Sequence, residues 1–244
     1  MSSDTPGFPP APPQPPLPPP PPPYGAPPPG ALPWERRSEL GFVTALLETV
    51  KLFVTKPEEA WRLTREKGDY SEPLVFAILV SWVGIAVSSL WSGLLGQSWM
   101  AFLPADLKEK LGEAMATNAA AILIQVGLAP VFILIGLFVG AGIYHVSFML
   151  VGATNQSTAG FEGTFRVVAY ASVSNLANAI PFLGGLVALV WNVVLMVMGA
   201  VRIHRATQGK AIAGVLIPIV LCCVCILAAV VLVIGGLAAA FANK

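Results

Sequence analysis

The sequence contains few charged residues. Only 11% of its 244 residues are Asp, Glu, Lys or Arg, and 55% are hydrophobic, whereas soluble domains average about a quarter charged residues. The net charge of +1 provides no basic face of the kind that binds nucleic acid, so we expect no nucleic-acid partner. Long uncharged runs in so apolar a chain predict an integral membrane protein whose solvent is the lipid bilayer.

Cysteine and histidine are also scarce. Cys222, Cys223 and Cys225 fall inside one apolar run, which excludes a disulfide framework. We interpret them as small packing residues, and a metal or redox pair is the alternative. The two histidines, His145 and His204, are far apart in the sequence, so neither a metal nor a cofactor is predicted.

The groups that membrane-embedded enzymes use are missing as well. No Asp or Glu occurs in any predicted membrane span, and the chain contains no HExxH sequence, P-loop or glycine-rich dinucleotide motif. General acid–base or nucleophilic catalysis needs such groups close together. We therefore expect a protein that is not an enzyme.

Proline, in contrast, is abundant at the N-terminus. Residues 1–33 contain 17 of the 23 prolines. Because proline fixes φ and removes the amide donor, this stretch is predicted to be a disordered, polyproline-like tail. It is either a semi-rigid spacer or the ligand of a protein partner with an aromatic groove, such as an SH3 or WW domain.

Residues 36–69 are predicted to form amphipathic helices that lie in the headgroup interface, pack against the cytoplasmic ends of the membrane helices, or do both. Apolar residues of the first helix recur at three- and four-residue steps, which places them on one stripe. The stripe consists of Val43, Leu46, Leu47, Val50, Phe53 and Val54. The second helix is predicted to place an aromatic and several basic side chains at the interface. These interfacial residues are Trp61, Arg62, Arg65 and Lys67.

The break between these two helices is predicted at Lys56–Pro57. Thr55 and Glu58 have the spacing of a capping box, and proline is tolerated in the first turn of a helix. A second helix is therefore expected to begin here.

Five apolar segments are predicted to cross the membrane, so the fold is expected to be an all-α, polytopic membrane helix bundle. About 20 apolar residues are enough to cross the hydrocarbon core. The predicted spans are residues 74–95, 119–151, 167–181, 186–201 and 211–241. The third is short and polar, and a re-entrant segment is the alternative to a full crossing. The third and fourth are expected to form a tight hairpin.

Polar residues within the spans are the candidates for function, because an unpaired polar group in lipid is costly. His145 is expected at the cytoplasmic boundary, hydrogen-bonded to a neighbouring helix or loop, and a proton relay is the alternative. Asn175 and Asn178 are three residues apart and share a helix face, where hydrogen bonds between helices are the expected role. Residues 172–178 also support an alternative function, that of a transporter or channel subunit.

The distribution of positive charge predicts the orientation. With a cytoplasmic N-terminus, the cytoplasmic segments hold eleven Lys and Arg residues and the outer segments hold three. Lys and Arg are enriched in short cytoplasmic loops. The N-terminus is therefore expected inside and the C-terminus outside.

Several motifs resemble the Yip domain family, polytopic membrane proteins whose eukaryotic members interact with Ypt/Rab GTPases of the early secretory pathway. The resemblance rests on G-T-F-R-V-V-A-Y at residues 163–170, on the Ile-Pro turn at 180–181 and on G-K-A at 209–211. It implies a five-span helical scaffold with a cytoplasmic N-terminus, and it adds Tyr170 and Pro181 to the candidate functional residues. The proline tract is unlike the acidic, aromatic tails of many eukaryotic members, so GTPase binding is not carried over. The chain looks more like the prokaryotic branch, and if it is prokaryotic the expected location is the bacterial inner membrane.

The leading hypothesis for function is thus a non-enzymatic membrane protein that organises the membrane or partner proteins. Its expected partners are the lipid bilayer, other membrane proteins or a second copy of the chain, and a protein that binds the proline-rich tail.

Overall fold

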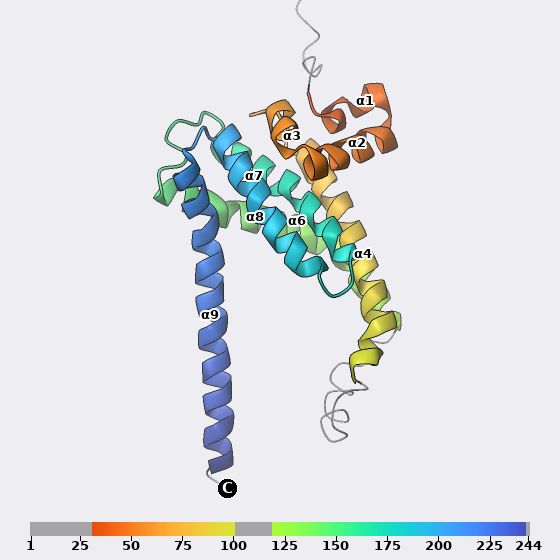
Figure 1. Cartoon of the computed structure of the whole chain (residues 1–244), viewed down its shortest axis with the longest axis vertical. Coiled ribbons are helices and arrows are strands. Elements are labelled where there is room, and N and C mark those ends of the chain that lie inside the picture. The colour runs from red at the N-terminus through yellow and green to blue at the C-terminus, as the bar shows by residue number, and fades with distance from the viewer. Residues whose placement is uncertain (1–30, 101–118, 243–244) are drawn as a thin grey trace, which may run out of the picture.

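The computed structural model describes residues 31–100 and 119–242, and it describes side chains within residues 31–92 and 120–232. Every regular element in these described ranges is helical, which confirms the all-α class. A group of short N-terminal helices lies at one end of a bundle of longer helices (Figure 1).

The N-terminal helices are joined by tight breaks. They are η1 (Pro33–Arg36), α1 (Arg37–Leu40), α2 (Phe42–Thr55) and α3 (Pro57–Leu63). Gly41 joins α1 to α2 with a φ of 84°, a left-handed conformation that glycine adopts without strain. The break between α2 and α3 falls at Lys56, as predicted, with Pro57 in the first turn of α3.

The predicted capping box at this break is wrong. Thr55 is still part of α2, and its hydroxyl donates a 2.7 Å hydrogen bond to the carbonyl of Lys51 one turn earlier. Lys56 is instead the N-cap residue of α3, and no side chain caps that helix. The competing bond within α2 explains the difference.

The predicted boundary of the proline-rich tail at residue 33 lies too late in the chain. Ala31 and Leu32 are buried in the core, and Pro33 begins η1. Residues 1–30, which carry the rest of the predicted tail, lie outside the described residues.

Four long helices have the length and apolar composition of membrane spans. They are α4 (Ser71–Met100), α6 (Ala119–Leu150), α8 (Gly184–Ile203) and α9 (Gln208–Ala242). They correspond to the predicted first, second, fourth and fifth spans. Most of the large apolar side chains described in α6 and α9 are exposed, as expected for helices solvated by lipid.

The predicted third span, residues 167–181, takes a different form. The chain forms α7 (Gly160–Ala171) and continues directly as the 3₁₀ helix η2 (Ser172–Ala179). Within the described residues, four helices rather than five therefore meet the length and composition of a membrane span. Residues 180–183 then turn the chain into α8, as expected for the hairpin, with the Leu183 amide donating to the Pro181 carbonyl at 2.7 Å.

Several helix ends meet on the side of the bundle that carries the N-terminal helices. Arg202, near the end of α8, forms a 3.2 Å ion pair with Glu66 in the loop after α3. Ser147, near the end of α6, donates a 2.7 Å hydrogen bond to the carbonyl of Gly214 in the first turns of α9. From this side α9 runs away from the rest of the bundle towards its C-terminal end (Figure 1).

Candidate functional site

The junction between the N-terminal helices and the bundle is built around aromatic rings. Phe53 of α2 stacks on Tyr170 of α7 with ring centroids 5.7 Å apart, and it meets Trp61 of α3 edge-on at 5.1 Å. Phe76 of α4 contacts both Tyr170, at 5.3 Å, and Trp34, at 5.9 Å. These five rings are fully or almost fully buried, so the N-terminal helices share one core with the bundle.

A row of six alternating charges crosses this junction, and we call it the charge row. Its members come from residues 35–37, from the loop after α3, from the first turn of α4 and from α7. In order of contact they are Arg37, Glu72, Arg65, Glu35, Arg166 and Glu162. Three carboxylates and three guanidinium groups balance one another, with nitrogen–oxygen distances between 3.2 and 3.8 Å.

Glu35 and Arg166 are the centre of the charge row. Both side chains are completely buried and lie 3.4 Å apart. The second carboxylate oxygen of Glu35 lies 3.3 Å from Arg65, and the Tyr170 hydroxyl donates to the first at 3.2 Å. Burial raises the pKa of Glu35 from 4.5 to about 7, although Arg166 and Arg65 act to lower it. Glu35 therefore exchanges its proton near neutral pH.

The loop before α4 closes over Arg166. The guanidinium group donates a 2.8 Å hydrogen bond to the carbonyl of Asp69. A Cβ at Gly68 would lie 2.6 Å from the same guanidinium group, so a larger residue there would have to displace the end of the Arg166 side chain. The Gly68 amide in turn donates to the carboxylate of Glu162. Arg166 thus holds the loop, η1 and α7 together.

A second polar row links α6, α7 and the end of α8. His145 Nδ1 lies 2.8 Å from the Thr164 hydroxyl, which lies 2.9 Å from His204 Nε2. His204 Nδ1 continues to the Ser157 hydroxyl at 2.9 Å. Burial lowers the pKa of His204 to about 4, so its ring is neutral at pH 7 and accepts one hydrogen bond while it donates another. The expected hydrogen bond of His145 to a neighbouring helix is present, through Thr164 of α7.

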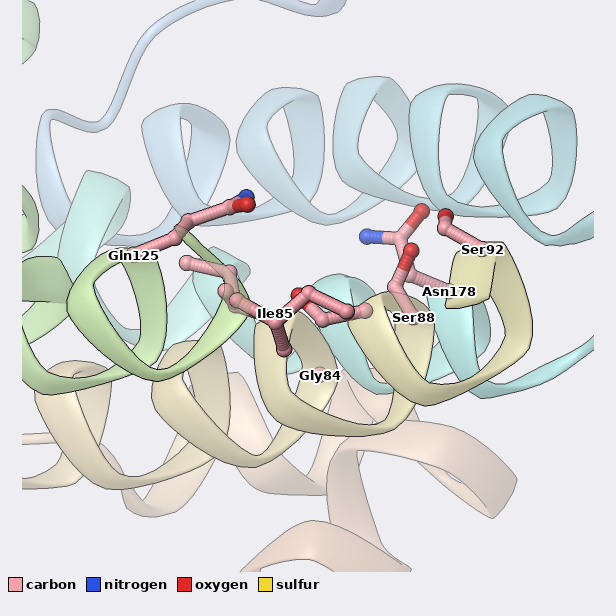
Figure 2. A pocket seen from close by; sticks show the side chains of 8 residues that line it. Gly84, Ile85, Ser88, Ser92, Gln125 and Asn178 are labelled. Atoms are coloured by element: carbon pink, nitrogen blue, oxygen red, sulfur yellow. The ribbon is translucent and has the colours of Figure 1, made fainter. Parts of the chain in front are cut away.

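The two predicted amides occupy different surroundings. Asn175 donates a 2.9 Å hydrogen bond to Ser81 of α4, which is the contact between helices that was expected of it. Asn178 instead faces a cavity between α4, α6 and η2, together with Gln125 and the serines of α4 (Figure 2). Pro181 lies in the turn before α8, outside both polar rows.

The predicted interfacial residues separate into two groups. Arg62 and Lys67 are exposed, as an interfacial role requires. Trp61 is buried against Phe53 and so packs in the core rather than facing the headgroups. Arg65 belongs to the charge row, where it pairs with Glu35.

Sequence reasoning missed the most buried members of these rows. Glu35 lies two residues after the proline tract, where nothing in the sequence marks it as a core residue. The burial of Arg166 in an ion pair could have been predicted, because a single cation at the start of an apolar run must find a partner. Nothing in the sequence distinguishes Thr164 and Ser157, because isolated hydroxyl residues are common. Within the described residues, no group of three or more His, Cys, Asp or Glu side chains could hold a metal ion.

The comparison with known proteins assigns the family. The family described as the Yip1 domain matches residues 50–241. The match contains Arg65, Arg166 and Tyr170, whereas Glu35 precedes it. No curated protein and no solved structure matches the chain. Since the match covers well over half of the chain and agrees with the motifs found in the sequence, this protein belongs to the Yip1 domain family.

Proposed function

We propose that this protein is a non-enzymatic organiser of the membrane, which it acts on by holding α2 in the headgroup region of the cytoplasmic leaflet. The observation that carries the proposal is an apolar stripe on the outer face of α2, formed by Val43, Leu47 and Val54. These side chains are 65%, 61% and 52% exposed. Steps of four and seven residues place them on one face of the helix, so they form a continuous apolar surface.

The other faces of α2 have different surroundings. Ala45, Thr49 and Phe53 are buried against the rest of the protein. Glu48 and Lys51 are exposed on a third, polar face. A helix with one face packed, one apolar face open and one polar face has the composition of a helix that lies in the membrane interface.

The charge row and the aromatic core hold this helix in place. An isolated amphipathic helix would bind the membrane and tilt freely, whereas α2 is attached to four helices long enough to span the membrane. Its apolar stripe therefore occupies a fixed depth in one leaflet. Insertion of side chains into one leaflet only is expected to displace headgroups, favour curvature and gather suitable lipids around the protein.

Five crossings and a cytoplasmic N-terminus are part of the proposal. The helix-end contacts of α6, α7, α8 and α9 lie on the side of the N-terminal helices, and the turn from η2 into α8 lies at the opposite end of α8. Passage of the chain from one side to the other through α7 and η2 would connect these contacts, and this supports five crossings. Charge counting supports a cytoplasmic N-terminus. In a prokaryote this membrane would be the inner one.

Reconstitution of the full chain into liposomes tests the function. We expect electron microscopy to show deformed vesicles with the unaltered protein and undeformed vesicles with Leu47→Asp, because a carboxylate on the apolar stripe opposes insertion. Thr44→Asp is the matched control, since Thr44 is exposed and lies outside the stripe. It is expected to deform vesicles as the unaltered protein does.

A fluorophore attached to α2 gives an independent readout of depth. In a chain whose three cysteines are replaced by serine, a polarity-sensitive dye at Leu47→Cys should be quenched by lipids with nitroxide headgroups, and a dye at Glu48→Cys should not. Equal quenching at both positions, or deformed vesicles with Leu47→Asp, would contradict the proposed function.

A further inference from the structure

The bundle contains a polar cavity at the end that faces away from the N-terminal helices. Its volume is about 290 Å³, and three elements line it. The second half of α4 contributes most of the wall, the first turns of α6 face it, and the last turn of η2 closes one side (Figure 2). The polar lining residues are Ser88, Ser89, Ser92, Gln125 and Asn178.

The lining is polar and uncharged. Three serine hydroxyls and two carboxamides can each donate and accept hydrogen bonds, and none of the described residues that line the cavity is ionisable. These groups belong to apolar helices at the level of the membrane. Hydrocarbon cannot satisfy them, and a polar group left unpaired there costs on the order of 1–3 kcal/mol or more. The cavity is therefore better matched to polar contents than to hydrocarbon.

Hydrogen bonds beside the cavity hold its walls in place. The indole of Trp82 on α4 donates to the carbonyl of Val126 on α6 at 2.9 Å. The indole of Trp91, further along α4, donates to the carbonyl of Ala179 at the end of η2 at 2.8 Å. One bond joins α4 to α6 and the other joins α4 to η2, so the cavity is formed before any ligand enters.

We propose that this cavity binds an uncharged polyhydroxylated group, such as a cyclic polyol or a sugar. The absence of ionisable lining residues argues against an ion, and the number of hydroxyls and amides argues against an apolar ligand. The volume lies near the lower limit of roughly 300 Å³ for ligand pockets, which suits a single ring. A free solute and the headgroup of a lipid both offer this chemistry. The proposal does not depend on the proposed function of α2.

Cysteine accessibility in the full chain tests the site. The three native cysteines are replaced by serine, Ser88→Cys is introduced, and the protein is reconstituted into phosphatidylcholine liposomes. We expect a membrane-impermeant thiosulfonate to modify this cysteine, because the cavity is polar. The matched control is Leu123→Cys on the lipid-facing side of α6, where Leu123 is 73% exposed; it should react at least ten times more slowly.

Two arms identify the source of the ligand. Free myo-inositol is added in one arm, and phosphatidylinositol is included in the liposomes in the other. At least a tenfold slower modification of Ser88→Cys by free myo-inositol assigns a solute site. Slower modification with phosphatidylinositol alone assigns a headgroup site. Both results support the proposal.

Variants of the two amides complete the test. Asn178→Leu and Gln125→Leu are each combined with Ser88→Cys, and each should reduce the protection that the ligand gives this cysteine at least tenfold. Gln125 is exposed, so its replacement should not disturb folding. The proposal is overturned if Ser88→Cys does not react, if neither probe protects it, or if protection survives both leucine variants.

Discussion

At the scale of single residues, the buried pair Glu35–Arg166 is the most consequential feature of this protein. Two ions removed from water are costly to bury, and only close pairing and further hydrogen bonds compensate. Arg166 meets this condition through Glu35, Glu162 and the Asp69 carbonyl. We expect the pair to contribute less to net stability than to the choice of one orientation for the N-terminal helices, since undocking would separate Glu35 from Arg166.

Loss of Arg166 is therefore expected to release the N-terminal helices. Arg166→Leu leaves Glu35 without its fully buried partner and should destabilise docking by about 3–5 kcal/mol. Hydrogen exchange of the α2 amides should accelerate by two to three orders of magnitude. Arg36→Leu is the control, because its pair with Glu39 is partly exposed and such pairs contribute about 0.2–1 kcal/mol. Similar exchange rates in both variants would show that the charge row does not hold α2.

Glu35 also makes docking dependent on pH. The pKa of Glu35 is about 7 when the N-terminal helices are docked and 4.5 when the side chain is exposed to water. Between pH 4.5 and pH 7, undocking therefore releases a proton from Glu35. Docking is then strongest below about pH 4.5, weakens as pH rises towards 7, and changes little above it. The whole effect is roughly 3 kcal/mol.

Hydrogen exchange of α2 at several pH values, corrected for the intrinsic exchange rate, measures this dependence. Glu35→Gln keeps a hydrogen-bond acceptor but does not titrate, so its docking should not vary between pH 5 and 8. Docking of the unaltered protein that strengthens with rising pH would contradict the assignment of the proton to Glu35.

At the scale of elements, η2 depends on glycine in its neighbours. The backbone of η2 passes so close to α4 that a Cβ at Gly84 would overlap the carbonyl oxygen of Asn175. A Cβ at Gly184, at the start of α8, would overlap the carbonyl oxygen of Ala177 in the same way. The 3₁₀ helix therefore fits between α4 and α8 only because both present glycine at the contact.

Gly84→Ala should consequently lower the melting temperature. Alanine normally stabilises a helix relative to glycine by up to about 1 kcal/mol, but here the overlap should cost about 1–3 kcal/mol. Gly136→Ala in α6 is the matched control, because nothing lies within 4 Å of a Cβ there. We expect scanning fluorimetry in detergent to show a lower melting temperature for Gly84→Ala and an equal or higher one for Gly136→Ala. An unchanged melting temperature for Gly84→Ala would contradict the close contact.

At the scale of the whole molecule, the number of crossings decides where the C-terminus lies. If α7 and η2 cross together, the chain crosses five times and its two ends lie on opposite sides. If they do not cross while the four long helices do, both ends lie on the same side.

Reporter fusions distinguish these topologies. A reporter that matures only in the cytoplasm should be active when fused before Met1 and inactive when fused after Lys244. A periplasmic or luminal reporter at the same positions should give the opposite pattern. Activity of the cytoplasmic reporter at both ends would indicate four crossings, and activity at Lys244 alone would reverse the orientation.

The sequence by itself determined the all-helical class, the four long apolar helices, the break at Lys56 and the family, because hydrophobic length and helix-breaking residues are local properties. It also marked His145 and Asn175 as polar residues that need partners. Only the tertiary structure decided which partners they have, that Trp61 is a core residue and that Ala31 and Leu32 are packed. The charge row was equally beyond the sequence, since Glu35 and Arg166 are 131 residues apart. Burial and pairing of charges depend on which segments meet in space, and no local pattern records that.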